Sequence, residues 1–290
     1  MTYLLALLLG LVQGVAEFLP ISSSGHLTLA DALLQRVFGD STQTLSGPEF
    51  TIAVHVGTLG SIVVVYWRRL LEAATNVRLI GYVVLATLPV VGTGLLAKDL
   101  IDDLLSDPIA VGFALCVTGV LLALIGVVER RRGTVPPPPS QEDEPPPPVN
   151  VPSGVVPSGR TMETMTWRDA LVVGLMQAIA PVPGISRSGS TIFAGVLAGM
   201  DRRAAADFSF FIAIPAIAGA AVMEVKDVVE KGELAVAADV LFWGATVAFV
   251  TGLVALKVLL AIVAKGQLNW FAAYCLAVGV GAVAWFGLGG

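Results

Sequence analysis

Charged residues are scarce in this chain of 290 residues. They make up 13% of the sequence, whereas a soluble domain carries about 25%. Hydrophobic residues make up 56%, and they fall in long runs. A transmembrane helix needs about 20 consecutive, mostly apolar residues, and several of the runs reach that length. The sequence therefore excludes a water-soluble fold and predicts an all-α polytopic membrane protein.

Other absences narrow the function. The net charge of −5 leaves no basic surface for nucleic acid. The two cysteines, Cys116 and Cys275, lie inside apolar runs without metal-ligand spacing, which indicates packing residues and no disulfide. No haem or iron–sulfur ligands are evident, so redox chemistry is not expected. No Lys or Arg precedes the apolar start at Tyr3, so we interpret the N-terminus as mature protein, not a signal peptide.

About six apolar stretches are long enough to span a bilayer, and four others are too short. Each short pair is joined by a break rich in Gly, Ser and Pro. This pattern predicts two re-entrant helical hairpins, whose irregular backbone survives only where it is buried in protein or lines a wet cavity. The long stretches lie at 50–67, 79–97, 108–128, 207–223, 237–263 and 268–288, and the short ones at 3–19, 27–38, 168–182 and 191–200.

The two hairpins belong to an internal repeat. Residues 8–34 and 172–198 align without a gap, and ten of the 27 positions are identical, including a Gln and a Ser-x-Ser-Gly motif. A segment at 133–166 carries PPPP twice and should be a disordered tether. The sequence thus predicts a first repeat at 1–132, this linker, and a second repeat at 167–290, each with one hairpin and three spans.

Arginine clusters predict that the two repeats are inverted. They lie at 68–69, 130–132 and 202–203, and placing all three in the cytoplasm satisfies the positive-inside rule. Span 50–67 then runs inward and its counterpart 207–223 runs outward. In inverted-repeat proteins the site lies near the midplane, where the broken helices of both halves meet.

The first hairpin carries a carboxylate at membrane depth. Gln13 and Glu17 are four residues apart and share one helix face. A lone carboxylate in the bilayer costs about 2.5–3.5 kcal/mol, so Glu17 needs a partner, a metal ion or a wet cavity. The simpler alternative is a structural carboxylate paired with an Arg or a hydroxyl. The hairpin then continues through Ser22, Ser23, Ser24 and Gly25 to His26, a candidate acid/base or nucleophile.

The second hairpin carries a permanent cation among hydroxyls. Arg187 offers a planar fork suited to phosphate oxygens, and it stands just before an apolar half-helix whose N-terminus attracts anions. The alternative is ordinary helix capping, with Arg187 reaching to the interface. Capping explains one Ser but not the whole set, which comprises Gly184, Ser186, Ser188, Gly189, Ser190 and Thr191.

The chain has only two histidines. We interpret His55, at the start of a spanning helix, as a packing or supporting residue rather than a catalytic one. A carboxylate, a His, hydroxyls and an Arg at one depth suit phosphoryl transfer, because that chemistry depends on positioning and on stabilising oxygen charge.

The motifs QGVAE (13–17), PISSSGH (20–26) and PGISRSGST (183–191) resemble those of the undecaprenyl-pyrophosphate phosphatases, the BacA/UppP family. The resemblance continues through 55–69 and 207–215 and covers most of the chain. It implies six spans, two re-entrant hairpins, and removal of the terminal phosphate from a C55-type prenyl pyrophosphate. It also implies a multi-pass protein of the cell membrane, with a site facing the outer side.

The resemblance also implies roles for the residues. Ser23 or His26 would lead the attack, Glu17 would bind metal or handle protons, and Arg187 would clamp the phosphates. Whether Ser23, His26 or a water is the nucleophile stays open. A divalent ion, Mg²⁺ or Ca²⁺, is expected at Glu17, with Gln13 as a weaker second ligand because many members carry Glu there. Substrate contacts are expected from Gln13, Ser22, Ser24, Gly184, Ser186, Ser188 and Thr191.

One alternative belongs to another class of function. Inverted repeats with broken helices are also a transporter architecture, so a flippase for a polyprenyl phosphate is the competing hypothesis. His26 weighs against it, because transport alone has little need of an acid/base group. The sequence leaves open whether the chain forms a homodimer.

Overall fold

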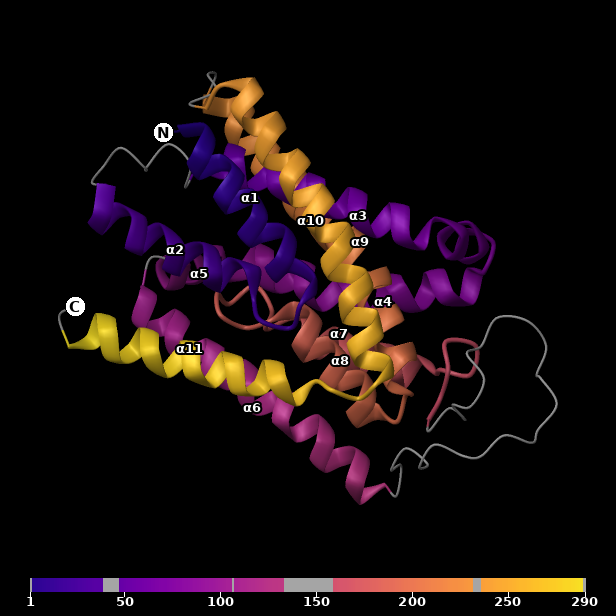
Figure 1. Cartoon of the computed structure of the whole chain (residues 1–290). Coiled ribbons are helices and arrows are strands. Elements are labelled where there is room, and N and C mark those ends of the chain that lie inside the picture. Colours follow the sequence, from indigo (N-terminus) through magenta and orange to yellow (C-terminus); the bar gives the residue numbers. More distant parts are fainter. Residues whose placement is uncertain (1, 39–46, 106, 133–158, 232–235, 289–290) are drawn as a thin grey trace.

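A computed structural model of the chain describes residues 2–38, 47–105, 107–132, 159–231 and 236–288. Within these ranges the regular secondary structure is helical, apart from one isolated bridge between Arg160 and Met200. Figure 1 shows the arrangement. The helices are α1 (Thr2–Phe18), α2 (Ser23–Phe38), α3 (Pro48–Ala74), α4 (Val77–Leu96), α5 (Lys98–Leu105), α6 (Pro108–Arg131), α7 (Trp167–Gln177), α8 (Arg187–Ala198), α9 (Arg202–Lys231), α10 (Ala238–Ala264) and α11 (Asn269–Gly287).

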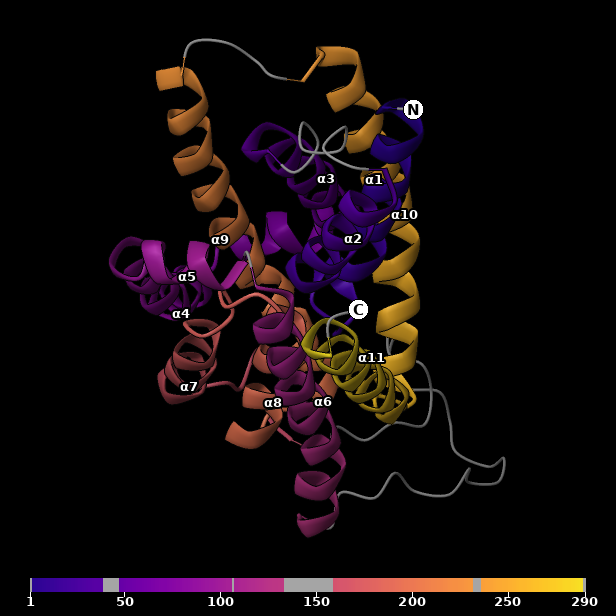
Figure 2. The same cartoon turned by 90° about the vertical axis from the view of Figure 1, so that its left-hand side faces the viewer.

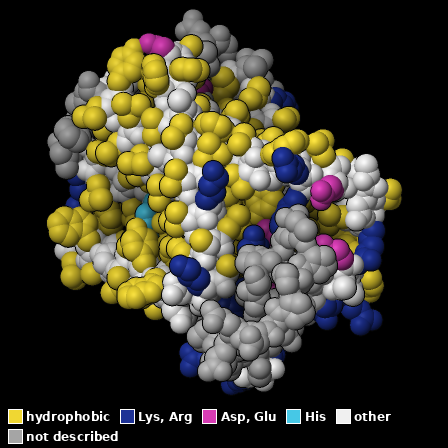
Figure 3. All heavy atoms as spheres, turned by 45° about the vertical axis from the view of Figure 1, so that its right-hand side comes forward, with side chains coloured by type: hydrophobic (Ala, Val, Ile, Leu, Met, Phe, Trp, Pro, Cys, Tyr) yellow, Lys and Arg dark blue, Asp and Glu magenta, His cyan; other side chains and the backbone are white. Residues whose placement is uncertain are grey.

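Six of these helices are long and apolar enough to cross a membrane: α3, α4, α6, α9, α10 and α11. They match the six stretches that the sequence predicts. Large hydrophobic side chains such as Val64, Val84, Val120 and Val254 are exposed on them, and hydrophobic side chains cover much of the upper and left parts of the face drawn in Figure 3. Since such a surface is stable only in lipid, the chain is an all-α polytopic membrane protein, as predicted.

The two predicted hairpins are present as pairs of shorter helices. α1 and α2 are separated by a break at residues 19–22, and α7 and α8 by a break at 178–186. α7 and α8 have 11 and 12 residues, which at 1.5 Å per residue reach only about half of a 30 Å hydrocarbon core. Neither can cross it alone, so the chain has to turn inside the protein.

Glycines at equivalent positions of the two repeats, 164 residues apart, each pack closely against a helix of the other repeat. Gly10 of α1 lies against Gly244 of α10, and its equivalent Gly174 of α7 lies against Ala86 of α4. The breaks behave alike. The Thr118 hydroxyl on α6 donates to the Gly184 carbonyl at 2.8 Å. At the equivalent place, the Cys275 thiol on α11 donates to the Pro20 carbonyl at 3.6 Å. We therefore propose that residues 1–132 and 167–290 are two interlocked, inverted halves.

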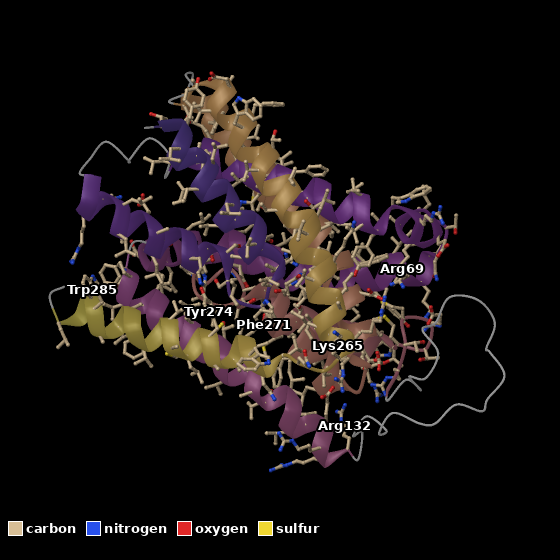
Figure 4. All side chains as sticks on the ribbon, in the orientation of Figure 1. Arg69, Arg132, Lys265, Phe271, Tyr274 and Trp285 are labelled. Carbon is tan, nitrogen blue, oxygen red and sulfur yellow. The ribbon has the colours of Figure 1, made fainter. Side chains whose placement is uncertain are left out.

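Arginines gather at one end of the bundle, called here the arginine-rich end, defined by Arg69, Arg132, Arg160 and Arg202. Figure 4 shows Arg69 and Arg132 together with Lys265 on the side opposite Trp285. Each of these arginines forms an ion pair or hydrogen bonds with other residues of the chain. Arg69 pairs with Asp207, Arg160 with Asp169, and Arg202 with Glu129, while Arg132 donates to the Val196 and Leu197 carbonyls at the end of α8.

The end of the predicted linker is ordered, which corrects its boundary. Residues 133–158 lie outside the described residues, but 159–166 pack against the protein. The Arg160 N–H donates to the Gly199 carbonyl at 2.9 Å, its side chain reaches Asp169, and Met165 is buried. Sequence composition did not reveal this because the partners of Arg160 come from the helix ends of α7 and α8.

The breaks of the two hairpins meet in the middle of the bundle. Two views a quarter-turn apart show the α1–α2 connection beside the segment that leads into α8 (Figures 1 and 2). The Gly184 N–H donates to the Ser22 hydroxyl at 3.1 Å. Around this junction, Phe18, Ile192, Phe208 and Leu256 belong to the largest hydrophobic core. The non-helical backbone is thus enclosed by protein, as membrane depth requires.

Replacing Gly10 by Ala should destabilise the α1–α10 contact, because the added Cβ would lie 2.5 Å from the Gly244 carbonyl oxygen. We expect a loss of about 1–3 kcal/mol, the usual cost of overpacking, seen as a lower midpoint of thermal unfolding in detergent. Gly92→Ala on α4 is the matched control, because a Cβ there meets nothing within 4 Å. Equal midpoints for the two variants would contradict the close packing of α1 on α10.

Candidate active site

Ser22 builds the first break. Its φ of 70° places a non-glycine residue in the left-handed region, which persists only where the surroundings hold it. Its hydroxyl accepts the Gly25 N–H at 3.3 Å, capping α2, and the Gly184 N–H at 3.1 Å. Its carbonyl accepts the His26 N–H at 3.1 Å. One residue therefore starts α2 and ties the two hairpins together.

The second break positions Arg187 at the start of α8. Gly184 has a φ of 92°, and a Cβ there would lie 2.5 Å from the Val111 carbonyl oxygen, so only glycine fits. Ser186 caps α8 by accepting the Gly189 N–H at 3.1 Å, and its own N–H donates to the Thr118 hydroxyl at 2.9 Å. Arg187 is consequently held at a helix N-terminus, where the dipole favours anions.

Glu17 is the centre of the polar cluster. Its Oε1 accepts Arg187 Nη2 at 2.6 Å, and its Oε2 accepts Ser23 Oγ at 2.6 Å and Gln13 Nε2 at 3.0 Å. His55 Nε2 lies 3.8 Å from the same Oε2. The Glu17 side chain is 6% exposed and that of Arg187 14%. The structure thus brings together Glu17, Ser23 and Arg187 from the two hairpins.

Two buried polar atoms in this cluster have no hydrogen-bond partner among the described residues: Arg187 Nη1 and Gln13 Oε1. Native proteins rarely leave such atoms unpaired, because an unpaired buried group costs about 1–3 kcal/mol. A free donor on Arg187 and a free acceptor on Gln13, beside one carboxylate, are therefore available to a ligand that both accepts and donates hydrogen bonds.

The hydroxyls of the second hairpin are hydrogen-bonded within the protein. Ser186 and Ser188 lie 3.3 Å apart. Thr191 donates to the Arg187 carbonyl at 2.7 Å and lies 2.6 Å from Ser209. All are buried. They build the turn that carries Arg187, and their predicted contact with a substrate stays a prediction. In the first hairpin, Ser24 lies 3.4 Å from Ser22.

His26 has a partner that the sequence did not identify. Its Nδ1 lies 2.8 Å from the Ser22 carbonyl and its Nε2 lies 2.8 Å from the Tyr274 hydroxyl. The two rings are stacked, with centroids 5.6 Å apart. A carbonyl only accepts, so Nδ1 carries a proton and Nε2 accepts from Tyr274. Tyr274, labelled in Figure 4 on α11, is one aromatic residue in an apolar run, and nothing local in the sequence marked it.

His55 also belongs to the cluster. The sequence interpreted it as a packing or supporting residue, and the structure places its ring beside Glu17 rather than in an apolar core. One feature of the sequence could have indicated this. The chain has only two histidines, and one of them, His55, lies in a helix predicted to span the membrane. No group of three or more His, Cys, Asp or Glu side chains that could hold a metal ion is found in the part of the chain that the structure describes.

One family model and several known proteins match nearly the whole chain. A family model described as bacitracin resistance protein BacA matches residues 6–281. An undecaprenyl-diphosphatase of Rhodopirellula baltica is 40% identical over 275 residues, covering 94% of each chain. One from Desulfatibacillum aliphaticivorans is 35% identical over 305 residues, covering 96% of this chain and 97% of the relative. One from Bacteroides fragilis is 35% identical over 290 residues and covers 95% of each.

Arg187→Met should lower the stability of the folded protein by about 3 kcal/mol, because removing one partner of a buried ion pair leaves the other charge uncompensated. The measurement is thermal unfolding in detergent, arranged as a cycle with Glu17→Gln and the double variant. The double variant should lose less than the sum of the single losses. Strict additivity would show that the two side chains do not interact energetically.

Proposed function

The chain belongs to the family described as bacitracin resistance protein BacA, and we propose that it removes the terminal phosphate from a membrane-bound polyprenyl pyrophosphate of the undecaprenyl type. The products are the monophosphate carrier and inorganic phosphate. The relatives are named undecaprenyl-diphosphatases, and the reaction returns the lipid carrier to use. The observation that carries the proposal is Ser23 Oγ, held 2.6 Å from Glu17 Oε2 while Arg187 holds Oε1.

This arrangement assigns three roles. Ser23 is the nucleophile, because a hydroxyl hydrogen-bonded to a carboxylate base is the usual signature of an activated serine. Glu17 accepts its proton. Arg187 binds the terminal phosphate, and its unpaired Nη1 offers a donor already aimed into the site. An Arg clamp on a transferring phosphoryl group stabilises the charge that spreads over its oxygens.

The chemistry runs in two steps. Ser23 Oγ bonds to the terminal phosphorus, its proton passes to Glu17, and the bond from that phosphorus to the bridging oxygen breaks. The bridging oxygen leaves with the electron pair as part of the prenyl monophosphate. Water then attacks the phosphorus of the phosphoserine as the bond from phosphorus to Ser23 Oγ breaks. The proton held by Glu17 returns to Ser23 Oγ, one proton of the water is released to solvent, and the other leaves with inorganic phosphate. Phosphate binding draws Arg187 away from Glu17, which frees the carboxylate to act as a base.

His26 has a different role in the proposed reaction, because it contacts the Ser22 carbonyl and Tyr274. It lies three residues after Ser23 on α2, so the two share a helix face. With Nδ1 tied to the Ser22 carbonyl, the Nε2–Tyr274 pair can exchange a proton with the leaving phosphate or with the attacking water. The proposal therefore gives the nucleophile role to Ser23 and a proton-handling role to His26.

A divalent ion fits beside this cluster. The Glu17 carboxylate and the unpaired Gln13 carbonyl oxygen are the oxygen ligands that Mg²⁺ and Ca²⁺ prefer, and Mg²⁺ is commonly held by one carboxylate and substrate phosphates. When bound, such an ion would neutralise charge on the phosphate oxygens.

We further propose that the site opens to the outer side of the cell membrane. The arginine-rich end fits the cytoplasmic side under the positive-inside rule. Salt bridges and capped helix ends occupy that end, whereas Tyr274, at the His26 side of the site, is half-exposed.

A serine activated by a carboxylate favours the enzyme over the flippase alternative, since transport forms no bond to phosphorus. Purified protein should release inorganic phosphate from the prenyl pyrophosphate. Binding of the lipid without release would favour transport.

Ser23→Ala should abolish covalent labelling. Wild-type protein mixed with pyrophosphate substrate labelled at the terminal phosphate, and quenched in denaturing detergent at neutral pH, should carry one labelled phosphoserine found by mass spectrometry at residue 23. Ser24→Ala, the neighbouring hydroxyl, should still form the label. A label that persists in Ser23→Ala, or one found on His26, would assign the nucleophile elsewhere.

Tyr274→Phe should lower kcat about tenfold with little change in KM, because the ring stays stacked on His26 while the hydroxyl that orients Nε2 is lost. The pH dependence of kcat should change with it, since the hydroxyl favours one protonation state of His26. Steady-state phosphate release across pH, compared with wild type, is the measurement. An unchanged kcat and pH profile would leave Tyr274 with packing alone.

A further inference from the structure

A pocket of about 850 Å³ lies at the arginine-rich end, between the starts of α4 and α7. These two helices pack against each other, as two views show (Figures 1 and 2). Residues of the segment 160–166 and Ala198, at the end of α8, complete its walls. The pocket therefore lies at the ends of α7 and α8 that are farthest along the helices from the break, and it shares no residue with the polar cluster around Glu17.

Two arginines that line this pocket are exposed and available to an anion. Arg168, at the start of α7, makes no hydrogen bond or ion pair within the part of the chain that the structure describes, and its guanidinium carbon lies 5.5 Å from the centroid of the Trp167 ring. Arg78 on α4 uses Nη2 to donate to the carbonyls of Glu163, at 3.0 Å, and Met165. Its other nitrogens remain available. Because a guanidinium is a planar fork suited to phosphate oxygens, the pair suits a phosphate group.

The charges of the pocket match a single negative charge. Its described lining has three arginines and two acids, which is a net charge of +1. Arg160 and Asp169 form an ion pair and cancel each other. Arg78 and Arg168 then face Glu163 alone. A phosphodiester carries one negative charge, so it would neutralise the pocket, and the Glu163 carboxylate would accept hydrogen bonds from a headgroup that carries hydroxyls.

The aromatic residues place the pocket at the level of the lipid headgroups. Trp and Tyr are typical of the membrane–water interface, and Trp167 and Tyr82 both line the pocket. Their faces are already covered, since Arg168 lies over Trp167 and Arg78 lies over Tyr82. An ammonium headgroup would need such a face and would meet a guanidinium there. The pocket therefore favours an anionic headgroup over a zwitterionic one.

An exposed apolar surface leads from the pocket along α7. Val172 and Leu175 follow Arg168 by four and seven residues, so the three side chains share one helix face. Val172 lines the pocket, and both apolar side chains are exposed. In a bilayer these side chains would contact acyl chains. The surface thus suits a ligand with a phosphate at one end and hydrocarbon at the other, and not a soluble phosphate.

We propose that this pocket binds an anionic phospholipid of the surrounding leaflet, with its phosphodiester on Arg78 and Arg168 and an acyl chain along Val172 and Leu175. The arginine-rich end fits the cytoplasmic side, where the leaflet carries anionic lipids and basic pockets between helices bind their headgroups. A lipid bound there would join α4, α7 and the segment 160–166, and would stabilise the base of the second hairpin. The inference goes beyond the proposed reaction and uses none of its residues.

The test uses the full chain, delipidated in detergent, and follows thermal unfolding as phosphatidylglycerol is added. We expect the midpoint of unfolding to rise, because a ligand that binds only the folded state stabilises it by mass action. Phosphatidylcholine with the same acyl chains, and the water-soluble headgroup glycerophosphoglycerol, should need at least about fivefold higher concentrations for the same rise. An equal effect of either compound would overturn the assignment to an anionic lipid.

Arg168→Gln should raise about fivefold the phosphatidylglycerol concentration that gives half of the maximal rise, because one arginine near an anionic headgroup contributes about that factor. Arg68→Gln on α3 is the matched control. Arg68 is also exposed and lies over a neighbouring tryptophan, Trp67, but it does not line the pocket, so this variant should behave as wild type. An unchanged concentration in Arg168→Gln, or an equal increase in Arg68→Gln, would refute the site.

Should Arg168→Gln fail to fold, photo-crosslinking of the wild-type chain decides. A phosphatidylglycerol analogue with a photoreactive group in its acyl chain, close to the glycerol, should label residues 168–175. Excess phosphatidylglycerol should suppress this label, and excess phosphatidylcholine should not. A label elsewhere in the chain, or one that both lipids suppress equally, would show that the pocket is not an anionic-lipid site.

Discussion

The structure depends on the pairing of one buried carboxylate with one buried guanidinium. Glu17 and Arg187 each carry a charge that costs about 2.5–3.5 kcal/mol at membrane depth on insertion scales, and they meet at 2.6 Å from opposite hairpins. Neither hairpin can place its charge in the bilayer interior without the other. Because each charge stands next to a break in a helix, the polar cluster forms only where the two hairpins meet.

The breaks themselves need specific residues. Ser22 is held at a positive φ and Gly184 occupies a place where a side chain would meet backbone. Hydrogen bonds from Thr118 on α6 and between Ser22 and Gly184 satisfy the backbone that the turns expose. These hydrogen bonds hold Ser23 and Arg187 at the ends of the two breaks, and in the proposed reaction groups that are positioned in advance stabilise a transition state most effectively. Within the same cluster, Arg187 Nη1 and Gln13 Oε1 have no hydrogen-bond partner among the described residues, so both atoms are available to a ligand.

Sequence reasoning predicted the parts that have a local or repeated signature. The six spans follow from apolar length, the hairpins from short apolar runs around Gly and Ser, and the meeting of Glu17 with Arg187 from the repeat. It did not predict Tyr274 against His26, the ordering of 159–166, or the direction of the His55 ring. These depend on where α11 places Tyr274 relative to α2, on which helix ends Arg160 can reach, and on the hydrogen bond from His55 Nδ1 to the Thr51 carbonyl. Such contacts join distant elements, and neither periodicity nor spacing encodes them.

The repeat also explains why the residues proposed for the reaction occur at one junction and not once in each repeat. Residues that build the turns recur 164 positions apart, as Ser22 and Ser186 or Gly25 and Gly189 do. The reactive residues do not recur: Ser23 corresponds to Arg187, Glu17 to Pro181, and His26 to Ser190. Gln177 shows the consequence. Its equivalent Gln13 donates to Glu17, but Gln177 donates to the Ala86 carbonyl, because Pro181 offers no carboxylate. The scaffold brings the two breaks together, and in the proposed reaction the first break supplies a base and a nucleophile while the second supplies a cation.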